Sequence, residues 1–236
     1  MKFTDHNSPE KSIIDNNFKS IPYMDMWISS IVEGYIYEKV DKVDEKGYRQ
    51  EYNERYGKKE GEFKSWDQNG QLTLQCYYKE WKLEGEFKLW YENGQLSLQC
   101  YYKDGKMEGE YKSWWEENGQ LWRQCYYKDG KKEGEYKQWY ENGQLSLQCY
   151  YKDGKEEGEY KSWWKENGQL WRQCYYKDGK KEGEYKQWYE NGQLRSQMYY
   201  KDGKMEGENK HWDGYGNLTE HKIYNGDEAI EDFLKK

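Results

Sequence analysis

The dipeptide Glu-Gly recurs seven times in this chain, and its spacing limits what the chain can fold into. Successive glycines of these dipeptides are 24 or 25 residues apart, and a tryptophan follows each glycine at the fifth position. The glycines are Gly61, Gly85, Gly109, Gly134, Gly158, Gly183 and Gly207, and the tryptophans are Trp66, Trp90, Trp114, Trp139, Trp163, Trp188 and Trp212. Such a unit is too short for a four-stranded propeller blade, which takes about 40–45 residues. The sequence therefore predicts a linear array in which each unit contacts only its neighbours.

Two turn signals divide each unit. Asn-Gly and Asp-Gly dipeptides alternate along the array, for example at positions 93–94 and 104–105, with runs of alternating character between them. These dipeptides supply the positive φ angles of two-residue hairpin turns. The predicted fold class is all-β: an elongated, single-layer antiparallel β-meander of tandem hairpin repeats, each about 24 residues long.

The alternation assigns side chains to two faces of the expected sheet. Cys100 falls on the more apolar parity of its strand, and Gln99 falls on the other. On the neighbouring strand Tyr111 lies on one parity, and Glu110 and Lys112 lie on the other. The regular recurrence of Glu and Lys predicts solvated cross-strand charge pairs and not a catalytic site.

The chain divides into four segments. Seven repeats span residues 60–226, and residues 32–59 form a degenerate first repeat. Residues 1–31 are a distinct segment that we expect to cap the N-terminal end, with a short helix. Residues 227–236 (DEAIEDFLKK) carry Ile230, Phe233 and Leu234 at helical spacing, with acidic residues first and lysines last, which predicts a C-terminal capping helix. Caps are expected because an open meander exposes its edge strands.

Residues 177–194, KDGKKEGEYKQWYENGQL, resemble the MORN repeat, and more closely the variant found in antitoxin-like proteins of the YwqK type. The shared features are Asp-Gly-Lys, Glu-Gly-Glu-Tyr-Lys, an aromatic pair and Glu-Asn-Gly. The resemblance covers residues 60–226 well and residues 33–59 weakly. It implies an elongated β-meander that serves as a scaffold, dimerisation surface or partner-binding platform. The antitoxin-like variant implies neutralisation of a toxin.

The five cysteines occupy one position of successive units: Cys76, Cys100, Cys125, Cys149 and Cys174. Equivalent positions lie two strands apart, about 9.6 Å. Disulfides need Cα atoms within about 7 Å, and a shared tetrahedral zinc is excluded by the same separation. We therefore expect the cysteines to pack in the sheet, and we expect no metal or cofactor.

Catalysis is not expected either. The three histidines, His6, His211 and His221, are not repeated and have no Ser-His-Asp or metal-ligand spacing. The carboxylates recur in ladders, without the low-dielectric pocket that would separate their pKa values for acid–base work. The sequence therefore predicts that the protein is not an enzyme.

The charge balance limits the partners. The formal net charge is −7, whereas nucleic-acid binding needs a clustered positive excess, and an acidic chain is a poor match for anionic membranes. No apolar run approaches the roughly 20 residues of a membrane span, and the N-terminus lacks a secretory signal. We expect an intracellular, cytoplasmic protein (host cytoplasm if the source is a virus).

The 13 tryptophans and 27 tyrosines supply the remaining hypothesis. The tryptophan row at the fifth position and the tyrosine row through Tyr78, Tyr102 and Tyr127 are each either the core of the sheet or a contact surface. The extra or unit-specific aromatics are the better contact candidates, because they alternate between units as a core ladder would not require: Trp81, Trp115, Trp122, Trp164 and Trp171.

The expected function is a non-catalytic scaffold for protein–protein interaction, with self-association as one form of it. Toxin neutralisation, and carbohydrate or small-ligand binding through the aromatic ladders, are the alternatives.

Overall fold

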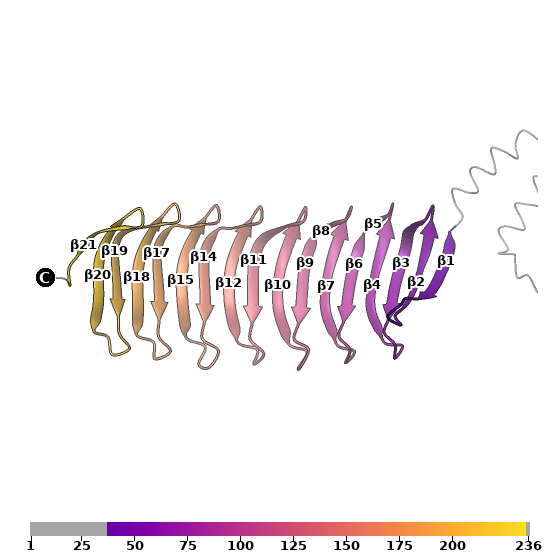
Figure 1. Cartoon of the computed structure of the whole chain (residues 1–236), viewed down its shortest axis with the longest axis horizontal. Helices are drawn as coiled ribbons and strands as arrows, with labels where there is room; N and C mark the ends of the chain where they lie inside the picture. Colours follow the sequence, from indigo (N-terminus) through magenta and orange to yellow (C-terminus); the bar gives the residue numbers. More distant parts are fainter. Residues whose placement is uncertain (1–36, 235–236) are drawn as a thin grey trace, which may run out of the picture.

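The computed structural model describes residues 37–234, which form one antiparallel sheet of 21 strands and contain no helix. Figure 1 shows the strands side by side along the long axis of the molecule, from β1 at one end to β21 at the other. Strands pair with their neighbours in the sequence, for example β3 with β4 and β19 with β20. The prediction of an open all-β meander is confirmed.

Seventeen strands form the ladder of the meander. They are β1 (Glu38–Val43), β2 (Arg49–Arg55), β3 (Lys58–Trp66), β4 (Leu72–Lys79), β6 (Gly85–Trp90), β7 (Leu96–Lys103), β9 (Gly109–Trp114), β10 (Leu121–Lys128), β11 (Lys131–Trp139), β12 (Leu145–Lys152), β14 (Gly158–Trp163), β15 (Leu170–Lys177), β17 (Gly183–Trp188), β18 (Leu194–Lys201), β19 (Lys204–Trp212), β20 (Leu218–Asn225) and β21 (Glu228–Asp232). Four two-residue strands lead into β6, β9, β14 and β17: β5 (Lys82–Leu83), β8 (Lys106–Met107), β13 (Lys155–Glu156) and β16 (Lys180–Lys181).

The Asp-Gly dipeptides form the two-residue turns that were predicted. Both positions have positive φ, 50° at Asp104 and 81° at Gly105, which is the backbone of a type I′ turn. The Glu-Gly dipeptide of the preceding unit stabilises this turn, because Glu84 Oε2 accepts a hydrogen bond of 2.9 Å from the Asp104 N–H. The same bond recurs at the following turns, with Glu108, Glu133, Glu157 and Glu182 as acceptors. The Glu of the signature is therefore an inter-repeat cap.

The Asn-Gly dipeptides do not form two-residue turns, so that part of the prediction is wrong. Only the glycine has positive φ, 83° at Gly94. Tyr91 N–H donates to Gln95 O and Gly94 N–H donates to Tyr91 O, which leaves a three-residue loop with a left-handed glycine. In the 25-residue units the extra residue lengthens this loop, and Trp115 N–H donates to Gln120 O instead. An insertion there leaves the strands unchanged.

The register defines two faces. One, here called the cysteine face, carries the cysteines and the rings paired with them, for example Cys100 opposite Phe87 and Cys125 opposite Tyr111. The other, here called the glutamate face, carries the Glu-Lys pairs and the residues opposite them, for example Glu86 opposite Tyr101. The strands are bent along their length (Figure 1). Register shifts near the Asn-Gly loops mark β-bulges, which increase local bending and twist.

The core lies on the cysteine face. The five cysteines expose at most 3% of their surface, and the buried rings next to them include Phe63, Tyr136, Tyr160 and Tyr185. The cysteines are free thiols. A single layer has no second sheet to cover it, so the side chains of the same face must close over the cysteines. That crowding is expected on the inner side of a bent sheet.

In the repeats, lysine and glutamate on the glutamate face pair within one strand and not across strands as predicted; a cross-strand pair occurs between β1 and β2, where Lys39 Nζ lies 2.9 Å from Glu51 Oε1. Lys112 Nζ lies 2.7 Å from Glu110 Oε2, two residues before it, because residues i and i+2 of a strand share a face. The cross-strand partner of this carboxylate is an amide, since Gln124 Nε2 donates to Glu110 Oε1 at 2.6 Å. Hydrogen bonding to Lys112 lowers the pKa of Glu110. The glutamate face thus satisfies its own charges.

The C-terminal capping helix is also wrong. Residues of that segment form strand β21, which pairs antiparallel with β20. Gly226 and Asp227 both have positive φ, 59° and 76°, so they close another tight hairpin, and the free edge of β20 supplies partners that a short isolated helix lacks. Phe233 stacks on His221 with ring centroids 4.4 Å apart. The predicted N-terminal cap lies outside the described residues.

Burial should protect the cysteines from thiol reagents. Desolvation raises the pKa of the Cys76, Cys100, Cys125 and Cys174 thiols to about 11 and that of Cys149 to about 12. The reactive thiolate is therefore on the order of 100-fold scarcer at neutral pH than in an ordinary cysteine. Reaction with a chromogenic disulfide reagent should be at least that much slower in the native protein than in denaturant. One cysteine reacting natively at the denatured rate would contradict this packing.

Candidate functional site

A row of tyrosines is exposed on the glutamate face. Each follows a cysteine or Met198 in the sequence and keeps 41–48% of its surface accessible. The row consists of Tyr77, Tyr101, Tyr126, Tyr150, Tyr175 and Tyr199. Successive members lie two strands apart, about 9.6 Å. The tyrosines named from the sequence, Tyr78 and its equivalents, lie on the cysteine face instead and pack half-buried against the core.

Aromatic and amide side chains of the Asn-Gly loops tie each unit to the next. Tyr91 OH donates to Trp114 O at 2.7 Å, and Trp115 Nε1 donates to Trp139 O at 3.2 Å. Asn93 Nδ2 donates in the same direction, to Glu116 O at 2.9 Å. The first aromatic residue of the loop is therefore an interface residue of the array at Tyr91, Trp115, Tyr140 and Tyr189. Trp115, predicted as a partner contact, shares this structural role.

Four of the five predicted contact tryptophans come together as two pairs. Trp115 and Trp122 have ring centroids 5.2 Å apart, and Trp164 and Trp171 have centroids 5.6 Å apart. All four are half-buried. Both pairs lie in the 25-residue units, at the longer loops. The sequence indicated these residues singly, and only the structure shows that they form pairs.

The fifth, Trp81, stands apart and is 46% exposed. It replaces the glycine of an Asp-Gly turn, and its φ of 67° is an unfavourable left-handed conformation for a bulky residue. Lys58 Nζ lies 4.3 Å from its ring centroid. Strain of this kind persists where the surroundings or a function maintain it, which keeps Trp81 a candidate contact.

Two arginines of the cysteine face were not predicted. Arg123 and Arg172 take the repeat position that holds Leu98 and Leu147 in the intervening units. The register sets Arg123 opposite Ser113 and Arg172 opposite Ser162, within the row of core residues. The sequence did contain a signal for them, because arginine replaces an aliphatic residue at this position in alternate units.

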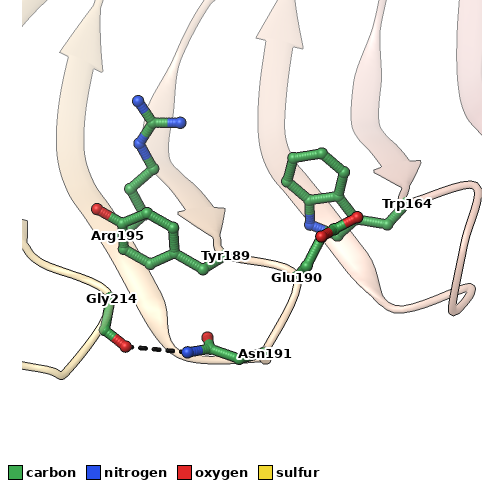
Figure 2. A pocket seen from close by; sticks show the side chains of 6 residues that line it. All are labelled: Trp164, Tyr189, Glu190, Asn191, Arg195 and Gly214. Atoms are coloured by element: carbon green, nitrogen blue, oxygen red, sulfur yellow. Dashed lines mark hydrogen bonds between the residues drawn. The ribbon is translucent and has the colours of Figure 1, made fainter.

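A pocket of about 500 Å³ opens at one edge of the sheet, where three successive loops contribute Trp164, residues 189–191 and Gly214. Figure 2 shows Trp164, Tyr189, Glu190, Asn191, Arg195 and Gly214 around it, with Asn191 Nδ2 donating to Gly214 O at 2.9 Å. Trp164 Nε1 is buried without a hydrogen-bond partner. The pocket therefore combines aromatic walls with one cation and one carboxylate.

The tryptophans at the fifth position are half-buried in every unit. The fully buried hydrophobic residues of the described chain are cysteine, phenylalanine and tyrosine, so this row lies at the margin of the core and not in its centre.

Within residues 37–234, no group of three or more His, Cys, Asp or Glu side chains is placed to hold a metal ion. The same residues include no helix of the length and apolarity that would cross a membrane.

The fold and its surfaces define a tandem β-hairpin repeat protein. Six of its segments match the family model of the MORN repeat variant: residues 59–80, 83–104, 107–129, 132–153, 156–178 and 181–202. These segments make up more than half of the chain, which therefore belongs to the MORN repeat variant family. Repeats of this family commonly act as scaffolds for protein or membrane interactions and are generally not enzymatic. No curated protein matches the chain.

Trp81 provides a test of the strained turn. Trp81→Gly should raise the free energy of unfolding by about 1 kcal/mol, because relief of the left-handed backbone outweighs the loss of an exposed cation–π contact. Trp81→Ala keeps the strain and loses the ring, so it should lower stability by about 0.5–1 kcal/mol. Urea unfolding of both variants measures these differences. Equal destabilisation by both would show that the turn is not strained.

Proposed function

We propose that this chain is a non-catalytic scaffold that binds a protein partner along its cysteine face. The observation that carries the proposal is the contrast in charge pairing between the two faces. On the glutamate face each lysine of the Glu-Lys motif lies 2.6–2.8 Å from a carboxylate of its own strand. On the cysteine face cations lie over aromatic rings instead, as Lys132 does 4.6 Å from the Tyr136 centroid. A face with unpaired cations and rings retains capacity for a partner.

The composition of the cysteine face supports a protein as that partner. Tyr, Trp and Arg are the residues most enriched at the centres of protein interfaces, since they combine a large contact area with polar groups. The rigid row of cysteines beneath them fixes their positions, which limits the ordering cost of association. An antitoxin would be one case of this proposal, with a toxin as the bound protein. The five free cysteines support an intracellular location, where thiols stay reduced.

Photo-crosslinking compares the two faces directly. A benzophenone amino acid replaces Tyr127 on the cysteine face in one variant, and its sequence neighbour Tyr126 on the glutamate face in another. We expect one protein to be captured in the native cells through position 127, several-fold more than through position 126. The pair Tyr176 and Tyr175 repeats the comparison two units further on. Equal capture from both faces, or capture through Tyr126 alone, would contradict the proposal.

The exposed tyrosine row favours one second candidate, carbohydrate binding through the glutamate face. Tyr126 and Tyr150 are exposed at a regular spacing on one face, which suits stacking on the successive units of a polysaccharide. Electrophoretic retardation in gels containing soluble glucans tests it. Retardation that Tyr126→Ser and Tyr150→Ser abolish would favour this candidate over the scaffold.

A further inference from the structure

Arg123 and Arg172 are held in equivalent surroundings two units apart. The Arg123 guanidinium carbon lies 4.3 Å from the Trp122 ring centroid and 6.0 Å from that of Tyr136. The Arg172 guanidinium carbon lies 5.1 Å from the Trp171 ring centroid and 4.5 Å from that of Tyr160. A guanidinium stacked on aromatic rings is fixed in plane, with its N–H donors at the edge of the plane.

The donors of these two arginines are incompletely used. The Nε of both is buried without a hydrogen-bond partner. Arg172 Nη2 donates to Tyr160 OH, and the same guanidinium hydrogen-bonds Tyr185. In the described part of the chain neither guanidinium has a carboxylate within 4.0 Å. A partly buried cation without an anion is unfavourable by itself. Binding of an anion would therefore be stabilised by desolvation that the fold has already imposed.

The surrounding charges point the same way. Over residues 121–187 the charged residues of the cysteine face are Arg123, Lys132, Arg172 and Lys181 against Glu156. Lys132 lies 4.6 Å from the Tyr136 ring centroid, and Lys181 lies 4.7 Å from that of Tyr185. This part of an otherwise acidic chain is positive, and its charges fall in two groups, one per 25-residue unit and the strand that follows.

We propose that these two groups are carboxylate-binding positions that together hold an acidic polypeptide segment of a protein partner. Each guanidinium takes one Asp or Glu side chain through its Nη donors, and the neighbouring lysine adds a second positive charge. The proposal rests on the function proposed above and names the chemistry of the partner.

Spacing adds a further condition. Arg123 lies on β10 and Arg172 on β15, four strand steps apart, which is about 19 Å at 4.8 Å per step. A segment extended along the array advances about 3.3 Å per residue. The partner should therefore carry acidic residues about six positions apart, so that both positions are occupied at once and the second contact is intramolecular.

A polypeptide fits this face better than other polyanions. The arginines lie among the core residues of the cysteine face with their Nε atoms buried, so a narrow chain reaches their remaining donors more easily than a flat bilayer does. A long nucleic acid would cross the edges of the array, which carry acidic loop residues such as Glu116, Glu117 and Glu141. A segment with a few carboxylates meets the positive groups without that repulsion.

Synthetic peptides test both chemistry and spacing. The probes are fluorescein-labelled Gly-Ser peptides with two Glu residues six positions apart, two Glu residues three positions apart, or none. Binding to the full chain is followed by fluorescence anisotropy at low salt. We expect the six-position peptide to bind about tenfold more tightly than the three-position peptide, and the peptide without Glu not to bind.

Substitutions locate the effect. Arg123→Gln and Arg172→Gln should each lower the affinity for the six-position peptide on the order of tenfold, as expected for the loss of one charged hydrogen-bonded contact. Lys112→Gln with Lys161→Gln is the matched control, because it removes two cations from the glutamate face at positions 49 residues apart. Arg123→Lys with Arg172→Lys keeps the charge without the planar fork and should restore part of the affinity. Thermal unfolding checks that each variant is folded.

The outcomes separate this proposal from the scaffold function. No binding of any peptide by the native chain, or equal loss in the glutamate-face control, overturns the carboxylate positions. Equal affinity for vesicles containing phosphatidylserine, lost in the arginine variants, would assign the face to membranes instead. If the protein captured through Tyr127 is still captured with both arginines replaced by Gln, the scaffold function stands and the carboxylate positions do not. If Tyr127 captures nothing while the peptides bind, the scaffold function fails.

Discussion

The stability of this sheet depends on the hydrogen bonds between adjacent repeats. A single layer has no second layer to pack against, so a unit gains stability mainly from its two neighbours. At one edge Glu133 Oε2 accepts the N–H of Asp153 in the next turn at 2.8 Å, and at the other edge Asn142 Nδ2 donates to Lys165 O at 3.0 Å. Both bonds join residues about one unit apart. The most regular residues of the sequence are therefore mostly interface residues of the array, and their regularity reflects assembly of the sheet.

This arrangement leaves the two faces free to differ. The glutamate face closes its charges within each strand pair, as Glu135 does with Lys137 at 2.7 Å and with Gln148 at 2.6 Å. The cysteine face holds the core, and its cations have rings as neighbours. Arginine among buried rings is unfavourable without an anion beside it, which is why the proposed partner is placed on the face that carries the core.

Turn chemistry and side-chain alternation made the meander and its faces predictable, because both act over a few residues. Cys100 and Gln99 fell on opposite faces as expected, and Asp104-Gly105 formed the expected turn.

Features that depend on the next unit were not predictable. The Asn-Gly loop takes its form from Tyr91 and Gln95 closing around three residues, and the tail after Asp227 became a strand because β20 offered a free edge. The helical spacing of Ile230 and Phe233 was real, but a helix of ten residues is weak in isolation. Trp122 and Trp171 could be named as unusual from the sequence, yet their pairing with Trp115 and Trp164 depends on the bulged strand and the longer loop.

The residues that distinguish the 25-residue units from the 24-residue units occur together, which indicates that they were copied as one block. Both 25-residue units share the same set of changes. The loop is one residue longer and begins with a tryptophan, the bulge of the next strand holds a second tryptophan, and an arginine follows that tryptophan, as in Trp115, Trp122 and Arg123. An arginine in the core row needs a ring to stack on, and Trp122 supplies it at 4.3 Å. The Trp115 ring packs against the Trp122 ring, with centroids 5.2 Å apart, and the longer loop accommodates a ring larger than the Tyr91 of its neighbour. The intervening 24-residue unit, with Leu147 in that row, then acts as a spacer. Duplication of a two-unit block, residues 109–157 and 158–206, thus copies the arginine position together with its distance to the next one, and produces a two-point surface from a single local change.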